Sequence, residues 1–327
     1  MQFVRLGASG LKVSRLCLGC MGFGGVKVGN FSWTLGYEDS AKVIKAALDV
    51  GINFLDTANM YSDGRSEEIV GKAIQGRRDE LVIATKVYHP TGTGPNDRGL
   101  SRKHVRREVK RSLERLNLKY IDLYQIHRWD YETPIQETLS TLNDLVHAEG
   151  VVSYIGASSM WAWQLATAMD LSERLGLEKF ISMQNQYSLV YREEEREMIP
   201  LCVSKGLGVI PWSPLARGFL SGKYSRHTTP HGRRYESDRY LKGRFFKPQD
   251  FDVLEAVLKV ATEKDVKPAQ VAVAWLLQKP GVTSPIVGAT KPSQIRELAE
   301  AVELKLSSDE TKQLEAPYRP MPVEDHI

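Results

Sequence analysis

Residues 81–127 read LVIATKVYHPTGTGPNDRGLSRKHVRREVKRSLERLNLKYIDLYQIH, which contains one complete strand–helix–strand unit. The short runs LVIATK (81–86) and IDLYQIH (121–127) begin almost continuously apolar, which is typical of strands buried on both faces. Between them, SRKHVRREVKRSLERL (101–116) has helical periodicity, with an apolar stripe opposite its lysines and arginines. The stripe consists of Val105, Val109, Leu113 and Leu116. This order predicts two parallel strands joined by a crossover helix.

The same unit recurs along the chain. The other apolar runs are RLCLG (15–19), INFLDTA (52–58), YIGASS (154–159), ISMQNQ (181–186), LGVIPWS (207–213) and SPIVGA (284–289). Several helical stretches end in a glycine before the next strand, namely at Gly51, Gly76, Gly150 and Gly206. Eight alternations without a Pro/Ser-rich linker predict an α/β fold, a (β/α)8 TIM barrel in which residues 1–327 form a single domain. FVRLGASGLKVS (3–14) predicts an N-terminal β-hairpin that caps the barrel, with its turn at GASG.

Composition and charge exclude several classes of protein. The chain has 327 residues, of which 42% are hydrophobic and 26% charged, and no apolar run is long enough to span a membrane. Three cysteines form no disulfide framework and the start of the chain lacks a secretory signal, so we expect a cytoplasmic protein. Residues 221–250 hold eight Lys/Arg and three Asp/Glu, which suggests an anionic ligand near this patch. The long break 214–251 is expected to be a functional loop without regular structure.

Polar residues stand where the apolar runs end. Asp56 follows INFL, Lys86 follows IAT and His127 follows LYQI. The later strands end in Ser158, Ser159, Gln184, Trp212 and Ser213. In a barrel all these ends open at one mouth, where active sites are built, so we expect these residues to converge.

An acid, a base and an imidazole at one rim suit a proton transfer that involves Tyr61, in the loop DTANMYSDG. A free phenol has a pKa near 10, which is high for proton exchange at neutral pH. A buried ammonium favours the phenolate, and a carboxylate paired to the lysine holds its position and charge. A neutral histidine can then orient a carbonyl oxygen toward the phenol. The set describes a proton donor for carbonyl reduction, which still requires a source of hydride.

These residues lie in motifs that resemble the aldo-keto reductase superfamily. The motifs are GxxGLxVSxLxLGxMxFG at the start, then DTAxxYxxGxSE, ATK, the IH of QIHRWD, YIGASS, QNQYS, PWSPLARG and VGATKPSQI. They fall in order over nearly the whole chain. The match looks closest to the bacterial YajO-type branch, which shares the QIHRWDY, TPI and YREEEREM segments.

The resemblance implies a nicotinamide-dependent reductase of aldehydes and ketones that acts on a small-molecule carbonyl substrate. Tyr61 would be the general acid/base, Lys86 and Asp56 the pair that lowers its pKa, and His127 the residue that orients the substrate. The cofactor would lie extended across the mouth, in contact with Gly22, Asp56, Ser158, Ser159, Gln184, Trp212, Ser213, Pro214, Leu215, Arg217, Lys223, Gly288, Thr290, Lys291, Gln294 and Glu297.

The adenosine end of that cofactor can also be argued from the residues. GATKPSQIREL (288–298) opens a helix with Pro292 near its first position, so free backbone N–H groups and Lys291 would face the ligand. Such a site suits a 2′-phosphate and favours NADPH, with NADH possible at lower preference. Many members of the family have Arg where this chain has Gln294 and Asn where it has Leu298. The preference for NADPH is therefore expected to be modest.

Aromatic residues in the loops after the first, third and fourth strands predict an apolar substrate pocket. They are Phe31, Trp33, Tyr88, Trp129 and Tyr131. Trp33, Tyr88 and Trp129 are predicted to contact the substrate together with Tyr61 and His127.

Other signals in the sequence are weaker. Cys17 and Cys20 form a CxxC, but their odd separation on a strand points them to opposite faces, and no second pair exists for zinc. His227 and His231 lie four apart in a loop that no helix aligns, so no metal site is expected. The glycine-rich GCMGFGG (19–25) lacks the GxGxxG spacing, and no Tyr-xxx-Lys is present, which disfavours an open-sheet dehydrogenase.

Two alternative functions remain open. The same scaffold could serve as an NADPH-binding regulatory or sensor subunit with little turnover, although the intact Asp56, Tyr61, Lys86 and His127 set argues against a degraded enzyme. The basic helix at 101–116 could bind nucleic acid, but a solvated outer helix of a barrel explains its charges better. We therefore expect neither a nucleic-acid nor a membrane partner.

Overall fold

The computed structural model describes residues 1–25, 33–227, 233–324 and 326, and these contain the predicted (β/α)8 barrel. Eight parallel strands form its sheet in the order β10-β3-β4-β5-β6-β7-β8-β9. Their bounds are β3 (Cys17–Gly19), β4 (Phe54–Asp56), β5 (Val82–Val87), β6 (Ile121–Ile126), β7 (Val152–Ser158), β8 (Phe180–Gln184), β9 (Gly208–Val209) and β10 (Ile286–Val287). Val209 pairs with Val282 in parallel, and the amide of Ile286 donates to Pro211 O at 2.8 Å. These contacts close the sheet between its two outer strands.

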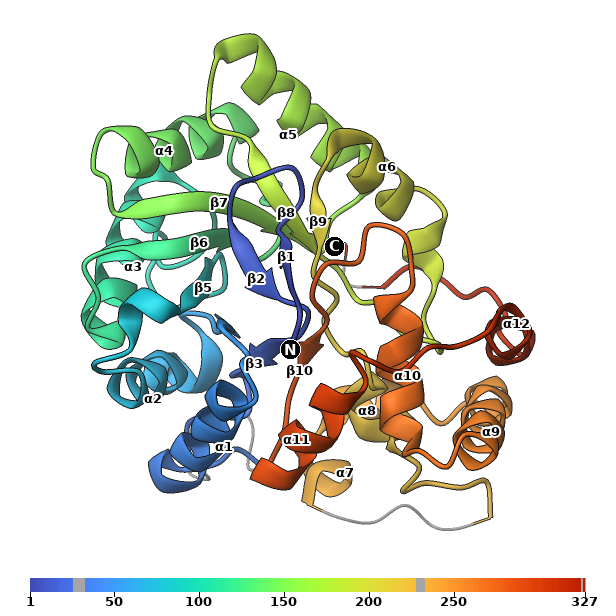
Figure 1. Cartoon of the computed structure of the whole chain (residues 1–327). Coiled ribbons are helices and arrows are strands. Elements are labelled where there is room, and N and C mark those ends of the chain that lie inside the picture. The colour runs from blue at the N-terminus through green and yellow to red at the C-terminus, as the bar shows by residue number, and fades with distance from the viewer. Residues whose placement is uncertain (26–32, 228–232, 325, 327) are drawn as a thin grey trace.

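Helices surround the sheet, as Figure 1 shows in a view along the barrel. In the described residues they are α1 (Tyr37–Asp49), α2 (Arg65–Ala73), α3 (Arg102–Leu116), α4 (Ile135–His147), α5 (Ala162–Leu175), α6 (Met198–Lys205), α7 (Arg233–Ser237), α8 (Arg239–Arg244), α9 (Pro248–Glu263), α10 (Pro268–Leu277), α11 (Pro292–Glu300) and α12 (Ser308–Glu315). Short 3-10 turns are η1 (Tyr61–Gly64), η2 (Arg78–Glu80), η3 (Glu193–Glu195) and η4 (Ala216–Ser221). No helix in the described ranges is both long enough and apolar enough to cross a membrane.

The helix predicted at 101–116 is α3, and its ends have the expected chemistry. The Ser101 side chain accepts a hydrogen bond from the amide of His104, which caps the first turn. Val105, Val109 and Leu116 are buried against the sheet, and Leu113 packs at the edge of the same core. The four glycines predicted to stop helices all have positive φ. That left-handed conformation is the one in which glycine is favoured.

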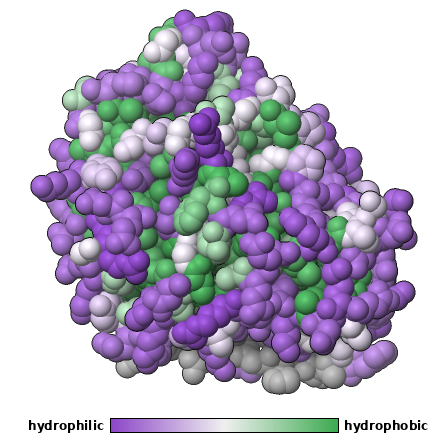
Figure 2. Space-filling view, viewed as in Figure 1, coloured by the Kyte–Doolittle hydropathy of each residue, from purple (hydrophilic) through white to green (hydrophobic). Residues whose placement is uncertain are grey.

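The N-terminal hairpin consists of β1 (Phe3–Arg5) and β2 (Lys12–Ser14), paired antiparallel. It crosses the middle of the barrel in Figure 1, and Leu6 and Val13 pack with apolar residues of the barrel interior. Gly7 has φ of +60°, and a Cβ there would lie 2.5 Å from Gly206 O, so only glycine fits this approach. Figure 2 shows the same face with hydrophilic residues around it and hydrophobic ones near its centre.

The prediction that 214–251 has no regular structure is wrong. In its described part, this segment forms η4, α7 and α8, and α9 begins at Pro248. The reason is a local aromatic cluster in which the Phe219 ring contacts those of Phe245, Phe246 and Phe251 at centroid distances of 5.1–6.4 Å. Burying these rings stabilises short helices that the glycines and charges of the segment disfavour.

The packing of α2 on α3 gives a test of the barrel wall. A Cβ on Gly71 of α2 would lie 2.3 Å from Leu116 O, whereas a Cβ on Gly243 of α8 meets nothing within 4 Å. Gly71→Ala should lower the free energy of unfolding by about 1–3 kcal/mol, because the two helices must separate. Gly243→Ala should raise it by about 0.5–1 kcal/mol, because alanine favours helix. Urea unfolding of both variants measures these changes in the free energy of unfolding. Changes of the same sign in the two variants would contradict the close packing of α2 on α3.

Candidate active site

The polar residues at the barrel mouth are placed by the alternation of side chains along each strand. On β5, Val82 and Ala84 lie among the apolar residues of the barrel interior, and Lys86 is the next inward residue. In the pairing with β6, Ala84 lies beside Leu123, and Lys86 lies beside Gln125. Inward residues are therefore apolar in the lower part of the barrel and polar toward the carboxyl ends of the strands.

Asp56, Lys86 and Tyr61 form a continuous chain of contacts. Lys86 is fully buried, and its Nζ lies 2.5 Å from Asp56 Oδ2 and 2.8 Å from Thr57 O. The same ammonium donates to Tyr61 Oη at 3.4 Å. Tyr61 begins η1, whose next two residues have φ of 49° and 54°. This left-handed turn is a strained conformation for residues other than glycine, and it holds the phenol within reach of the lysine.

The electrostatics of this group follow from its burial. Burial raises the pKa of the Tyr61 phenol above its usual value, and the positive charge of Lys86 only partly offsets this. Burial is the largest single effect on Lys86 and opposes its charge, but Asp56 and Tyr61 together more than offset it, so the pKa of Lys86 is raised. Lys86 acts on the pKa of Tyr61 in the predicted, lowering direction, whereas the Asp56 carboxylate raises this pKa. The net pKa still lies above the usual value, because removing the phenolate from water is the larger effect. At neutral pH the site presents a protonated phenol beside a charged ammonium.

His127 follows β6 directly and lies beside the phenol. Its ring centroid is 5.8 Å from that of Tyr61, in an edge-to-face arrangement. Burial lowers the pKa of His127 well below its usual range, and His89, Arg128 and Lys86 act in the same direction. The imidazole is therefore neutral at pH 7, as the proton-donor hypothesis requires.

Two residues at this site escaped the sequence analysis. The His89 ring lies 4.6 Å from that of His127, also edge to face. Gln125, fully buried on β6, donates from Nε2 to Asp56 Oδ1 at 3.0 Å. His89 could have been found from its place just beyond the carboxyl end of β5, and Gln125 from the two-residue period that points it inward beside Lys86.

The residues predicted to meet the nicotinamide are also brought together. Gln184 donates from its side-chain Nε2 to Asp56 Oδ1 at 2.9 Å. The backbone carbonyl oxygen of Gln184 accepts from Ser158 Oγ at 2.8 Å and from the Ser159 backbone amide at 3.1 Å. The Trp212 indole donates to Ser159 Oγ at 3.1 Å. Ser159 and Ser213 have φ of 42° and 54°, a conformation that non-glycine residues rarely adopt. Strain of this kind is concentrated at functional sites.

The residues predicted along the pyrophosphate lie in and around η4. Arg217, with φ of 56°, forms a 2.6 Å ion pair with Asp238, which is fully buried. Lys223 lies over the ring of Tyr224, with Nζ 4.9 Å from the centroid. Pro214 and Leu215 lead into the turn. The charge of Arg217 is thus matched by a carboxylate, and the positive patch is weaker here than the residue count suggests.

The start of α11 differs from the expectation of free N–H groups. Gln294 Oε1 accepts from the amide of Thr290 at 2.9 Å and from the amide of Lys291 at 3.1 Å. The glutamine therefore occupies donors that were predicted to face a phosphate, because a residue at the third helical position can fold back as a cap. Glu297 lies one turn further along α11, and Gly288 follows β10. Gly22 follows β3, and a Cβ built on it would lie 3.5 Å from the Trp33 side chain.

The predicted substrate contacts are distributed around the mouth. Trp33 is buried, while Tyr88 and Trp129 are partly buried. The Trp129 ring lies 6.2 Å from that of Trp163, which is 60% exposed, and Tyr131 is 59% exposed. Phe31, like His231, lies outside the described residues.

The C-terminal tail crosses to several loops of the mouth. Its His326 backbone carbonyl accepts from Tyr131 Oη at 3.1 Å, in the loop after β6. The His326 ring packs edge to face on Trp161, after β7, at 4.8 Å, and its Nε2 lies 3.1 Å from Glu194, after β8. The backbone amide of Glu324 donates to Tyr191 at 3.0 Å. One segment therefore ties three loops together.

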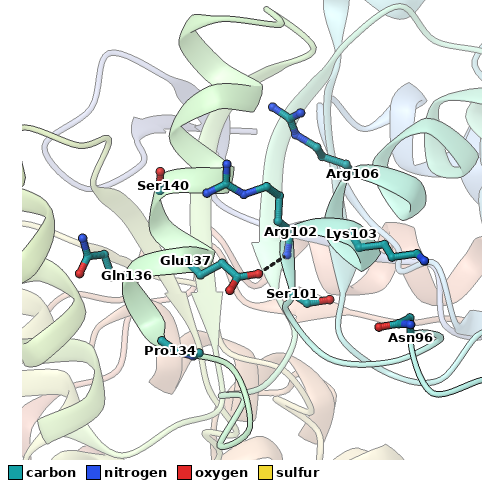
Figure 3. Close-up of a pocket in the computed structure, with 9 residues that line it drawn as sticks. All are labelled: Asn96, Ser101, Arg102, Lys103, Arg106, Pro134, Gln136, Glu137 and Ser140. Atoms are coloured by element: carbon teal, nitrogen blue, oxygen red, sulfur yellow. Dashed lines mark hydrogen bonds between the residues drawn. The ribbon is translucent and has the colours of Figure 1, made fainter.

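A surface depression of about 790 Å³ lies elsewhere, between the first turns of α3 and α4. Figure 3 shows Arg102 and Arg106 on α3 and Glu137 on α4, with the Glu137 carboxylate accepting from the backbone amide of Arg102 at 2.9 Å. None of the predicted catalytic residues lines it. The cations of α3 are partly neutralised, since Arg106 contacts Asp144 and Glu149.

Comparisons with known proteins identify the family of this chain. The model of the Aldo/keto reductase family matches residues 15–319. A versiconal hemiacetal acetate reductase of Aspergillus parasiticus is 42% identical over 340 aligned residues, which cover 98% of each chain. A protein of Schizosaccharomyces pombe, provisionally named as an aryl-alcohol dehydrogenase, is also 42% identical and covers 98% of this chain and 97% of its own. Members of this family are oxidoreductases of carbonyl and alcohol groups that use NAD(P)H, and this chain belongs to the aldo/keto reductase family.

Proposed function

We propose that this enzyme reduces aldehydes and ketones to alcohols with NADPH, and that Tyr61 is the proton donor. The observation that carries the proposal is the buried ammonium of Lys86, which bridges the Asp56 carboxylate at 2.5 Å and the Tyr61 phenol at 3.4 Å. A phenol held in this way has a fixed direction and a charged neighbour that stabilises the phenolate left after proton transfer.

Tyr61, Lys86 and His127 have separate roles in the proposed reaction. A dihydronicotinamide, when bound, supplies hydride to the carbonyl carbon. Tyr61 donates its proton to the carbonyl oxygen, and Lys86 stabilises the negative charge that remains. The neutral His127 ring, 5.8 Å from the phenol ring, can donate an N–H to the same oxygen and so orient the substrate.

The donor set at the mouth fits a nicotinamide. Gln184 makes its described hydrogen bonds to side chains through Nε2, and among the described residues no donor reaches its Oε1. This carbonyl oxygen suits the N–H₂ of a carboxamide. Ser158 and Ser159 would complete that contact, and Trp212 would offer an aromatic face to the ring. The remaining predicted contacts run through Arg217 and Lys223 to α11.

The preference for NADPH over NADH rests on α11 and is proposed to be modest. Lys291 and the first N–H groups of the helix favour a phosphate. The Gln294 cap occupies the backbone N–H groups of Thr290 and Lys291, just before the helix, at 2.9 and 3.1 Å, and it must rotate away before a phosphate can use them.

For the substrate, we propose aromatic aldehydes. The mouth carries Trp33, Tyr88 and Trp129, and aromatic faces suit an aryl group beside the carbonyl. The relative named as an aryl-alcohol dehydrogenase is consistent with this class.

The interpretations that concern domain organisation, location and partners stay predictions. They are a single domain over residues 1–327, a cytoplasmic location, and no metal, membrane or nucleic-acid partner. The ion pairs of α3 support the last of these, since they already use several of its cations. The bacterial YajO-type branch rests only on shared segments such as QIHRWDY, and the relatives found above are fungal. The regulatory subunit remains the alternative function.

Tyr61→Phe tests the proton donor. Reduction of p-nitrobenzaldehyde should fall by about 10²–10⁴-fold, because the phenol hydroxyl is lost. The Kd for NADPH, measured by fluorescence titration, should stay within about twofold. Tyr120→Phe, on the outer surface beside Arg78, is the matched control and should keep full turnover. A Tyr61→Phe enzyme with most of its activity would disprove the assignment.

The same assay on the wild-type protein distinguishes the reductase from the alternative function, the NADPH-binding regulatory subunit. Steady oxidation of NADPH by the aldehyde supports the reductase. Tight NADPH binding that stalls after one cycle would favour the regulatory subunit.

The pH dependence follows from the raised pKa of Tyr61. Reduction needs the protonated phenol, so its rate should change by less than about twofold between pH 7 and pH 9. Alcohol oxidation needs the phenolate, so its rate should rise about tenfold per pH unit while the phenolate is the minor form. Rates in both directions, measured with the aldehyde and its alcohol, check this. A reduction rate that halves near neutral pH would place the proton on another group.

Gln294→Arg tests the cofactor preference. The change removes the cap from the α11 donors and adds a cation, so the ratio of kcat/KM for NADPH over NADH should rise about tenfold. Gln294→Met removes only the cap and should raise the ratio by a smaller factor. If neither variant moves the ratio, the start of α11 does not contact the 2′-phosphate.

A further inference from the structure

Gln125 joins two parts of the candidate site that lie on different strands. Its Nε2 donates to Asp56 Oδ1 at 3.0 Å, and its Oε1 accepts from Gln184 Nε2 at 3.1 Å. Gln184 Nε2 donates to the same Asp56 oxygen at 2.9 Å. All three side chains are almost fully excluded from solvent. The result is a closed triangle of one carboxylate and two amides.

The chemistry of the triangle determines which way each amide faces. A carboxylate oxygen only accepts, so Gln125 and Gln184 must both turn an N–H₂ group toward Asp56. Gln125 then has only its carbonyl oxygen to offer Gln184, and Gln184 accordingly turns its own carbonyl oxygen elsewhere. Reversing either amide would place two acceptors together in a buried site, which is costly.

The strand between them is shaped to allow this contact. β7 lies between β6 and β8, and Gly156 of β7 is the register partner of Gln125. A Cβ on Gly156 would lie 3.1 Å from Gln125 Cγ and 2.6 Å from Ser182 Oγ. The absent side chain leaves the space in which Gln125 reaches across β7 to Gln184.

We propose that Gln125 is a positioning residue for carbonyl reduction, which holds the Asp56 carboxylate toward Lys86 and fixes the orientation of the Gln184 amide. The inference rests on the proposed function of Tyr61. Asp56 Oδ2 contacts Lys86, and Oδ1 is held by the two amides. Without Gln125 the carboxylate can rotate, and the ammonium that faces the phenol is no longer held in one place.

Gln125→Met tests the proposal, because methionine preserves length and volume but removes both hydrogen bonds. The kcat for p-nitrobenzaldehyde reduction should fall about tenfold or more, while the Kd for NADPH should change less than about threefold. The pKa of Tyr61 should rise by about half a unit or more, since a less firmly held Lys86 stabilises the phenolate less. The titration is followed by NMR with ring-labelled tyrosine, using Tyr61→Phe to assign the signal.

Gln164→Met is the matched control. Gln164 is equally buried, and its Oε1 caps α5 by accepting from the Trp161 amide at 3.0 Å. This variant should lose stability, as seen by urea unfolding, without moving the Tyr61 titration. A Gln125→Met enzyme with wild-type kcat and an unmoved Tyr61 titration would overturn the proposal and leave Gln125 a packing residue.

Assays of the wild-type protein distinguish a failure of the proposed function from a failure of the proposed role of Gln125. If it does not reduce the aldehyde, the proposed function fails, and the Tyr61 titration alone then decides whether Gln125 positions the Asp56–Lys86 pair. If it turns over normally and Gln125→Met does too, only the role of Gln125 fails.

Discussion

The buried ion pair of Asp56 and Lys86 is the constraint on which the rest of the site depends. Both charges have been removed from water at the top of an apolar barrel interior, and a buried charge costs several kcal/mol unless it is paired and hydrogen-bonded. The protein supplies those partners from the ends of several strands: the Thr57 carbonyl for the ammonium, and the amides of Gln125 and Gln184 for the carboxylate. A closed barrel suits this arrangement, because strands far apart in the sequence end at one mouth.

The same burial sets the chemistry of Tyr61 through two opposing effects. Removal from water disfavours the phenolate and the nearby ammonium favours it, and the first effect is larger in this structure. The phenol is therefore kept protonated, which suits a proton donor, while Lys86 limits the cost of losing that proton. Burial lowers the pKa of His127, so the imidazole stays uncharged and the positive charge is concentrated on the lysine.

Much of the fold and part of the site can be predicted from the sequence. Apolar runs of strand length, each ending in a polar residue, indicate the barrel and bring Asp56, Lys86 and His127 to one rim, because period and strand direction are local properties. Gln125 escapes because it lies inside an apolar run, where one amide resembles an ordinary strand residue. The cap by Gln294 and the helices after η4 depend on contacts between residues whose distances only the folded chain determines. Family motifs identify positions, whereas the partners of each position are a property of packing.

The tail that joins three loops of the mouth bears on how this enzyme and its relatives can diverge. In most barrels each loop can be lengthened, shortened or replaced with little effect on the others, because loops tolerate insertion independently of the scaffold. Here Tyr131, Trp161 and Glu194 share one contact residue, His326. A graft of any single loop from another member would remove that loop's contact with His326, the residue that also holds the other two loops. The three loops and the tail are therefore expected to change together among relatives. A chimera that exchanges all of them at once is the one that retains an ordered mouth.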